Sequence, residues 1–111
     1  MRNAACVLLG ILLAVACANA DSLADAARSY RRNGDYASLQ VIAAHLRKGM
    51  TRKQAETWLG PPYMEITEGS CVYGSDREAY VEEARRVLPW VLIVEYREET
   101  VTWWKLTWIG E

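Results

Sequence analysis

The fold is decided by residues 90–109, which read WVLIVEYREETVTWWKLTWI. This stretch is rich in branched and aromatic residues, and its side chains sort onto two faces with the period of two that is typical of β-strands. The pattern predicts two strands, Trp90 to Arg97 and Thr100 to Ile109, joined by a turn at Glu98-Glu99. We expect one face to form the core side of a sheet, with the residues Leu92, Val94, Tyr96, Trp104, Leu106 and Trp108.

The opposite face of the two predicted strands has an apolar centre and a polar fringe. Val101, Ile93 and Trp103 lie there together with Lys105. This composition is typical of a protein contact surface, and a tryptophan near its middle is a common anchor. We therefore predict that Trp103, Val101, Ile93 and Lys105 bind a protein partner.

A helical period precedes the strands. Apolar residues recur at steps of three and four between Tyr36 and Leu46, which predicts a helix from about Tyr36 to Arg47. Asp35 is placed to accept hydrogen bonds from its first free amides, and Gly49 can adopt the left-handed turn that ends it. Residues 21–34 are predicted to be a tether or lead-in helix, and residues 35–111 the domain itself.

A second short helix is marked by local signals at both ends. Thr51 and Gln54 have the spacing of a capping box, and Met50 precedes the cap as a hydrophobic staple does. Gly60 and the prolines after it stop the helix. The residues that define this segment are Gly49, Met50, Thr51, Gln54, Trp58, Leu59, Gly60 and Pro61.

Between the helices and the final strands, the pattern in residues 71–88 predicts one more strand and one more helix. Cys71 to Tyr73 is the strand, and Ser75 with Glu78 has capping-box spacing at the start of a helix over Asp76 to Leu88. The expected fold is thus α+β, a two-helix hairpin packed on a three-stranded antiparallel sheet (αα-βββ) with an extra helix inserted between strands 1 and 2. Two alternatives to a free contact face stay open: the inserted helix covers it, or the strand from Thr100 to Ile109 pairs with another chain by strand addition.

The first twenty residues resemble an export signal. Arg2 precedes an apolar run, and Ala18-Asn19-Ala20 has the pattern of a signal-peptidase cleavage site. The stretch ending at Cys17 also resembles a bacterial lipobox, in which this cysteine would be acylated and would anchor the protein to a membrane. Both readings place the protein outside the cytoplasm: at the outer membrane, on its periplasmic face, if Cys17 is acylated, and otherwise in the periplasm or secreted.

Composition excludes several functional classes. Thirteen Lys and Arg against fourteen Asp and Glu give a net charge of −1, which argues against nucleic-acid binding. His45 is the only histidine and Cys71 the only cysteine beyond the leader, too few ligands for a zinc site. A thiol hydrolase that uses Cys71 and His45 is the one enzymatic hypothesis, and we expect instead a non-enzymatic protein without cofactor, metal or small-molecule substrate.

The segment Lys48-Gly49-Met50-Thr51, Gln54-Ala55 and Leu59-Gly60-Pro61 resembles the G-M-T-x-x-x-(V/A)-x-x-x-L-G-x-P signature of the SmpA/OmlA domain. This family of small envelope lipoproteins includes the BamE component of the outer-membrane β-barrel assembly machinery. The resemblance implies an αα-βββ fold, protein contacts in outer-membrane assembly or integrity, and acylation at Cys17. Because similar units occur in β-lactamase-inhibitory proteins, a secreted or periplasmic inhibitor or immunity-type module is the alternative function.

Overall fold

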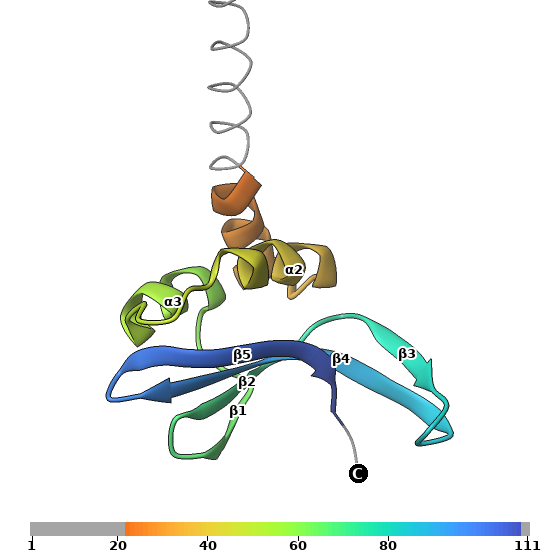
Figure 1. Cartoon of the computed structure of the whole chain (residues 1–111). Coiled ribbons are helices and arrows are strands. Elements are labelled where there is room, and N and C mark those ends of the chain that lie inside the picture. Colours follow the sequence, from red (N-terminus) through yellow and green to blue (C-terminus); the bar gives the residue numbers. More distant parts are fainter. Residues whose placement is uncertain (1–21, 110–111) are drawn as a thin grey trace, which may run out of the picture.

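The computed structural model describes residues 22–109, which form an α+β protein with helices on one side of an antiparallel sheet (Figure 1). Residues 22–33 are helical, and two short helices follow, α2 (Tyr36–His45) and α3 (Arg52–Leu59). The sheet has five strands: β1 (Met64–Thr67), β2 (Ser70–Tyr73), β3 (Glu78–Val81), β4 (Arg86–Arg97) and β5 (Thr100–Trp108). The predicted class, α+β with an antiparallel sheet, is confirmed, while the αα-βββ layout is matched only in part.

The long strand β4 organises the sheet. Its second part pairs with β2 and β5, for example Val94 with Cys71 and with Trp104. Its first part pairs with β3 in a second hairpin, in which Leu88 lies opposite Ala79. Since β2 and β3 both run antiparallel to β4, the chain from β2 through β3 to β4 resembles one long hairpin interrupted at residues 74–77.

The predicted helix over Asp76 to Leu88 was wrong, because this segment forms β3, a turn and the start of β4. The Ser75 hydroxyl does not cap a helix. It donates a hydrogen bond to the Trp90 carbonyl and accepts one from the Arg77 amide. Pairing with the extension of β4 satisfies backbone groups that a helix would have bonded internally, so tertiary context decides against the local capping signal.

The strand β1 was not predicted, although Tyr63 to Thr67 before Glu68-Gly69 has the composition of a strand that leads into a turn. The turn requires glycine at position 69. Gly69 has a φ of 87°, and a Cβ added there would lie 2.3 Å from the Tyr96 carbonyl oxygen. The Gly69 carbonyl in turn accepts a hydrogen bond of 2.7 Å from the Tyr96 amide, so β1 and β2 are tied to β4 at this point.

Both helices of the hairpin begin as predicted. The Asp35 side chain accepts a hydrogen bond from the Ser38 amide at the start of α2. At the start of α3, Thr51 and Gln54 form the reciprocal capping box, with both hydrogen bonds at 3.1 Å. The predicted end of the first helix was wrong, because α2 ends at His45 with Leu46 in extended backbone rather than near Arg47. Gly49 has a left-handed φ of 89°, but it lies in the turn beyond the helix.

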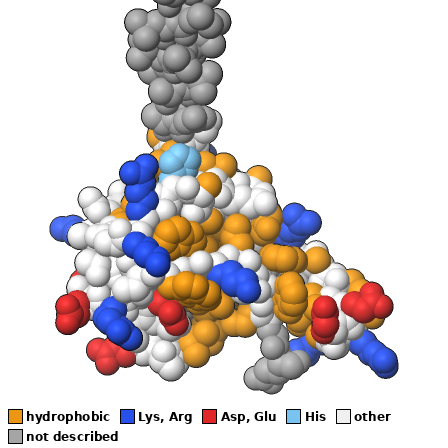
Figure 2. All heavy atoms as spheres, viewed as in Figure 1, with side chains coloured by type: hydrophobic (Ala, Val, Ile, Leu, Met, Phe, Trp, Pro, Cys, Tyr) orange, Lys and Arg blue, Asp and Glu red, His pale blue; other side chains and the backbone are white. Residues whose placement is uncertain are grey.

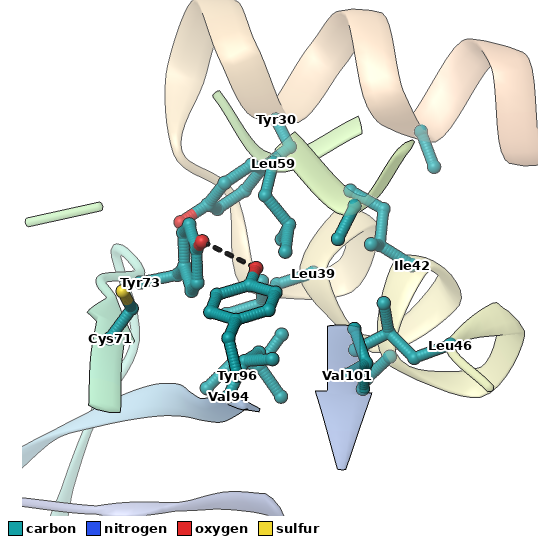
Figure 3. Packing of buried hydrophobic residues seen from close by; sticks show 14 residues of the cluster. Tyr30, Leu39, Ile42, Leu46, Leu59, Cys71, Tyr73, Val94, Tyr96 and Val101 are labelled. Atoms are coloured by element: carbon teal, nitrogen blue, oxygen red, sulfur yellow. Dashed lines mark hydrogen bonds between the residues drawn. The ribbon is translucent and has the colours of Figure 1, made fainter. Parts of the chain in front are cut away.

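The core lies between the helices and one face of the sheet (Figure 3). Leu39 and Ile42 of α2 and Leu59 of α3 are buried against strand residues. At its centre the hydroxyls of Tyr73 and Tyr96 share a hydrogen bond of 2.8 Å. The core-face residues predicted from alternation belong to this cluster or pack against it, namely Leu92, Val94, Tyr96, Trp104 and Leu106, while Trp108 is 39% exposed and packs edge-on against Trp90.

The helix over residues 22–33 is packed on the domain. Ala26, Ala27 and Tyr30 are buried, and the Tyr30 hydroxyl donates a hydrogen bond of 2.5 Å to the Gly74 carbonyl. Arg31 reaches the Thr57 carbonyl in α3. This segment is therefore part of the body rather than a free tether, whereas the predicted export signal and Cys17 lie outside the described residues.

Candidate protein-interaction surface

The helices all lie on one side of the sheet, so the second side is left without a covering helix in the described part of the chain (Figure 1). We call this second side the outer face. Strand pairing sets a row across it, in which Met64 lies opposite Val72, Val72 opposite Ile93, and Ile93 opposite Lys105. Neighbouring rows contain Val91 with Thr107, and Glu95 with Trp103. Because paired residues share a side, the registers define the outer face residue by residue.

Large apolar side chains on this face are exposed. Trp103 is 43% exposed, although a tryptophan this large is ordinarily mostly buried. Met64 is also exposed, and Ile93 lies between them, half-buried. Lys105 is exposed beside them, so the surface combines apolar contact area with a cation at its edge.

A largely apolar hollow of about 440 Å³ adjoins this row at the interruption between β2 and β3, where residues 33–34 and 74–76 also line it. Val72 and Val91 lie at its base, since both are buried although they belong to the outer face. Tyr63, Pro89 and Ile109 also line it. A hollow of this kind gives a partner's apolar side chain a place to be buried, which is how contact hot spots gain most of their binding energy.

Three of the four predicted contact residues, Trp103, Ile93 and Lys105, lie together on the outer face. The predicted placement of Val101 there was wrong, because this residue is 1% exposed and belongs to the core. The cause is a shift of register between Glu95 and Tyr96, which leaves Thr102 as an extra residue in β5. Such a bulge reverses the side on which the following residues lie.

No local signal in the sequence marks the bulge, but one other residue of the outer face could have been found. Met64 follows Pro61-Pro62 and precedes a Glu-Gly turn, which is a strand signal of moderate strength. The hypothesis that an inserted helix covers the outer face was wrong, because residues 76–88 form no helix. They form β3, a turn and the first part of β4 instead.

The residues of the hairpin motif hold α3 against the sheet. Gly49 and Met50 exchange backbone hydrogen bonds of 2.8 and 2.7 Å with Val101, and Thr51 forms a bridge with Thr100. Trp58 is partly buried against the core. These residues therefore act as structural elements of the fold.

A polar cluster lies on the helix side, around Arg52. Its guanidinium contacts Glu56 at 2.7 Å and Glu65 at 3.0 Å, and lies 4.9 Å from the centre of the Tyr96 ring. Cys71, which is fully buried, donates its thiol hydrogen to Glu65 at 3.2 Å. Hydrogen bonds from Cys71 and then Arg52 hold the pKa of Glu65 below its usual value.

The thiol-hydrolase hypothesis requires a thiolate at Cys71 near His45. Burial, followed by the hydrogen bond to Glu65, raises the pKa of Cys71 to about 11, which keeps the sulfur protonated at neutral pH. His45 Nδ1 lies 2.8 Å from the Val41 carbonyl oxygen within its own helix. The Cys71 thiol thus contacts Glu65, while the His45 ring contacts its own helix.

Residues 22–109 contain no group of three or more His, Cys, Asp or Glu side chains arranged to hold a metal ion. Within the same residues no helix is long and apolar enough to cross a bilayer. Comparison with protein-family models, with curated proteins and with solved structures gave no match. The fold itself is that of a small α+β protein, in which helices cover one face of the sheet and no helix within residues 22–109 covers the other.

Proposed function

We propose that this chain is a non-enzymatic cell-envelope protein that binds another protein through its outer face. The observation that carries the proposal is the exposed Trp103, with the half-buried Ile93 and the exposed Met64 in the neighbouring row, on a side of the sheet that no helix within residues 22–109 covers. Apolar side chains that stay exposed in the monomer contribute little hydrophobic stabilisation. A partner that buries them would gain the free energy of removing their surface from water.

A role of the SmpA/OmlA type, in support of outer-membrane assembly or integrity, is the form of this function that we favour. It is supported by the motif from Gly49 to Pro61, whose residues form α3 and the preceding turn that attaches the helical hairpin to β5. In this proposal Cys17 is acylated and anchors the protein at the periplasmic face of the outer membrane.

An inhibitor or immunity-type module is the second candidate, and a different feature favours it. The hairpin of β3 and the first part of β4 extends beyond the helices (Figure 1). Near its tip Tyr80 and Val87 lie opposite each other and are 62% and 54% exposed. A projecting hairpin with an exposed aromatic residue is suited to enter the cleft of another protein.

Site-specific photo-crosslinking in living cells tests the first candidate. A photoreactive residue at position 105 of the full-length chain is expected to give a discrete adduct with another protein, and Trp103→Ala should abolish that adduct. The matched control is position 53, because Lys53 is equally a surface lysine but lies on α3, on the helix side. Equal adducts from both positions, or none from position 105, would contradict binding through the outer face.

The same experiment separates the two candidates. A photoreactive residue at position 80 gives the strongest adduct if the projecting hairpin is the binding element.

The location of the protein is tested separately. Cys17→Ser is expected to release the protein from the membrane fraction, and the intact mass of the wild-type protein should include acyl chains. A soluble protein whose mature sequence begins at Asp21 would overturn the lipid anchor and favour the secreted alternative.

A further inference from the structure

The open edge of β5 is a second candidate surface, which borders the outer face at Lys105 and Thr107. One side of this strand pairs with β4 along its whole length. The other side is partnered only at its beginning, where Gly49 and Met50 bond to Val101 and Thr51 bridges to Thr100. Within residues 22–109, no strand pairs with this side of the segment from Trp103 to Trp108.

This edge lacks most of the devices with which proteins prevent strands from pairing. Exposed edges are usually short, bulged away, or protected by proline and several charges. The segment from Trp103 to Trp108 has one charged residue, Lys105, and no proline, and the register shift of β5 lies before it. In Figure 1 β5 runs along the front of the sheet with no other strand in front of it, and Figure 2 shows hydrophobic side chains gathered across this side.

The segment is complementary to itself. In an antiparallel pair of two copies centred on Leu106, Trp104 of each copy lies opposite Trp108 of the other, on the helix side of the joined sheet. On the outer side Lys105 lies opposite Thr107, so no two like charges face each other directly. Cross-strand aromatic pairs stabilise a sheet, whereas like charges directly opposite destabilise it.

We infer that two copies of this chain associate through the free edges of β5, in antiparallel register about Leu106, and form one sheet across both molecules. The part of β5 that would not fit this register, Thr100 and Val101, is the part already paired within the chain. A second copy is the occupant that the edge favours, because this pairing uses one surface twice and closes with twofold symmetry. The outer faces of the two copies stay open, so the dimer is compatible with binding of another protein there.

Two substitutions of opposite charge at one position test the register. Thr107→Lys places a lysine opposite Lys105 of the second copy, twice in the dimer, and Thr107→Glu places a carboxylate there. The full-length chain, purified in mild detergent, is examined by sedimentation equilibrium with each variant. We expect the wild-type chain to be a dimer. The dissociation constant of the dimer should be roughly tenfold larger in Thr107→Lys, and no larger than that of the wild type in Thr107→Glu.

A double variant distinguishes this register from a general effect of charge. Lys105→Glu combined with Thr107→Lys restores an opposite-charge pair and should restore the dimer. The melting temperature of the dilute, monomeric variants is the control for folding. A wild-type chain that is monomeric throughout, or a dimer that responds equally to Thr107→Lys and Thr107→Glu, would overturn the inference. A dimer lost only with Met64→Ala would show face-to-face association and would also overturn it.

Discussion

The two faces of the sheet are built from the same strands but have different surroundings. On the helix side Leu92 and Val94 are fully buried under α2 and α3. One residue further along, Ile93 lies on the outer face and is only half-buried, and no described helix covers it. The helices cover the core on one side, while on the second side Val72 and Val91 are buried but Met64 and Trp103 remain exposed. These exposed residues are the basis of the proposed binding through the second face.

Removal of an apolar side chain should therefore cost far more on the helix side. Leu92→Ala leaves a cavity in a fully buried cluster and is expected to lower the free energy of unfolding by about 3 kcal/mol. Ile93→Ala is the matched substitution on the outer face and should cost about 1 kcal/mol, since its side chain is already partly in water. Chemical denaturation of both variants measures the difference, and equal losses would contradict a single core.

The buried tyrosine pair contributes a hydrogen bond to the helix side of the sheet. Tyr73→Phe removes one hydroxyl of a hydrogen bond of 2.8 Å and leaves the Tyr96 hydroxyl without its partner. The expected loss is about 2 kcal/mol. A double-mutant cycle with Tyr96→Phe checks it, because removal of both hydroxyls should cost less than the two single losses added together. Strict additivity would show that the two hydroxyls do not interact.

Alkaline pH should weaken the helix side through Cys71. Burial raises the pKa of its thiol to about 11, against 9.0 for the free group, so the folded state keeps a proton that the unfolded chain loses. The stabilisation is complete below pH 9.0 and is lost as the pH rises toward about 11. Denaturation curves between these values should show the decline, and Cys71→Ala should reduce it, with the buried tyrosines contributing at the upper end. An unchanged decline in Cys71→Ala would contradict this assignment.

The turn between β4 and β5 is expected to show the smallest effect, in the opposite direction. Glu98 and Glu99 have φ angles of 52° and 63°, in the left-handed region that disfavours residues other than glycine, asparagine and aspartate. Glu98→Asn with Glu99→Gly provides the residues that such hairpin turns prefer and should raise the free energy of unfolding by about 1 kcal/mol. Thermal melting measures the gain, and a loss would indicate that the glutamates contribute contacts which outweigh the strain.

Local signals in the sequence predicted the fold where they agreed with the tertiary arrangement. Thr51 and Gln54 form the capping box, and the alternation in residues 90–97 sorts Leu92 and Ile93 correctly onto opposite faces. The segment from Ser75 to Leu88 was misread because capping-box spacing is local, whereas its pairing partner belongs to β4. Val101 was misplaced because one extra residue in β5 reverses the alternation, and nothing in the sequence marks the bulge.

Adjacent tryptophans on opposite faces allow binding through the outer face to be separated from packing of the core. Trp103 lies on the outer face and Trp104 packs against the core, so Trp103→Ala and Trp104→Ala remove the same side chain from the two surroundings. The measurement is the free energy of unfolding of each variant, together with the crosslinked adduct from position 105. We predict a loss of less than about 1 kcal/mol and no adduct for Trp103→Ala, and a loss of about 2 kcal/mol with the adduct retained for Trp104→Ala under conditions where it is folded. Equal destabilisation by both variants, or an adduct that persists in Trp103→Ala, would contradict a binding role for Trp103 on the outer face.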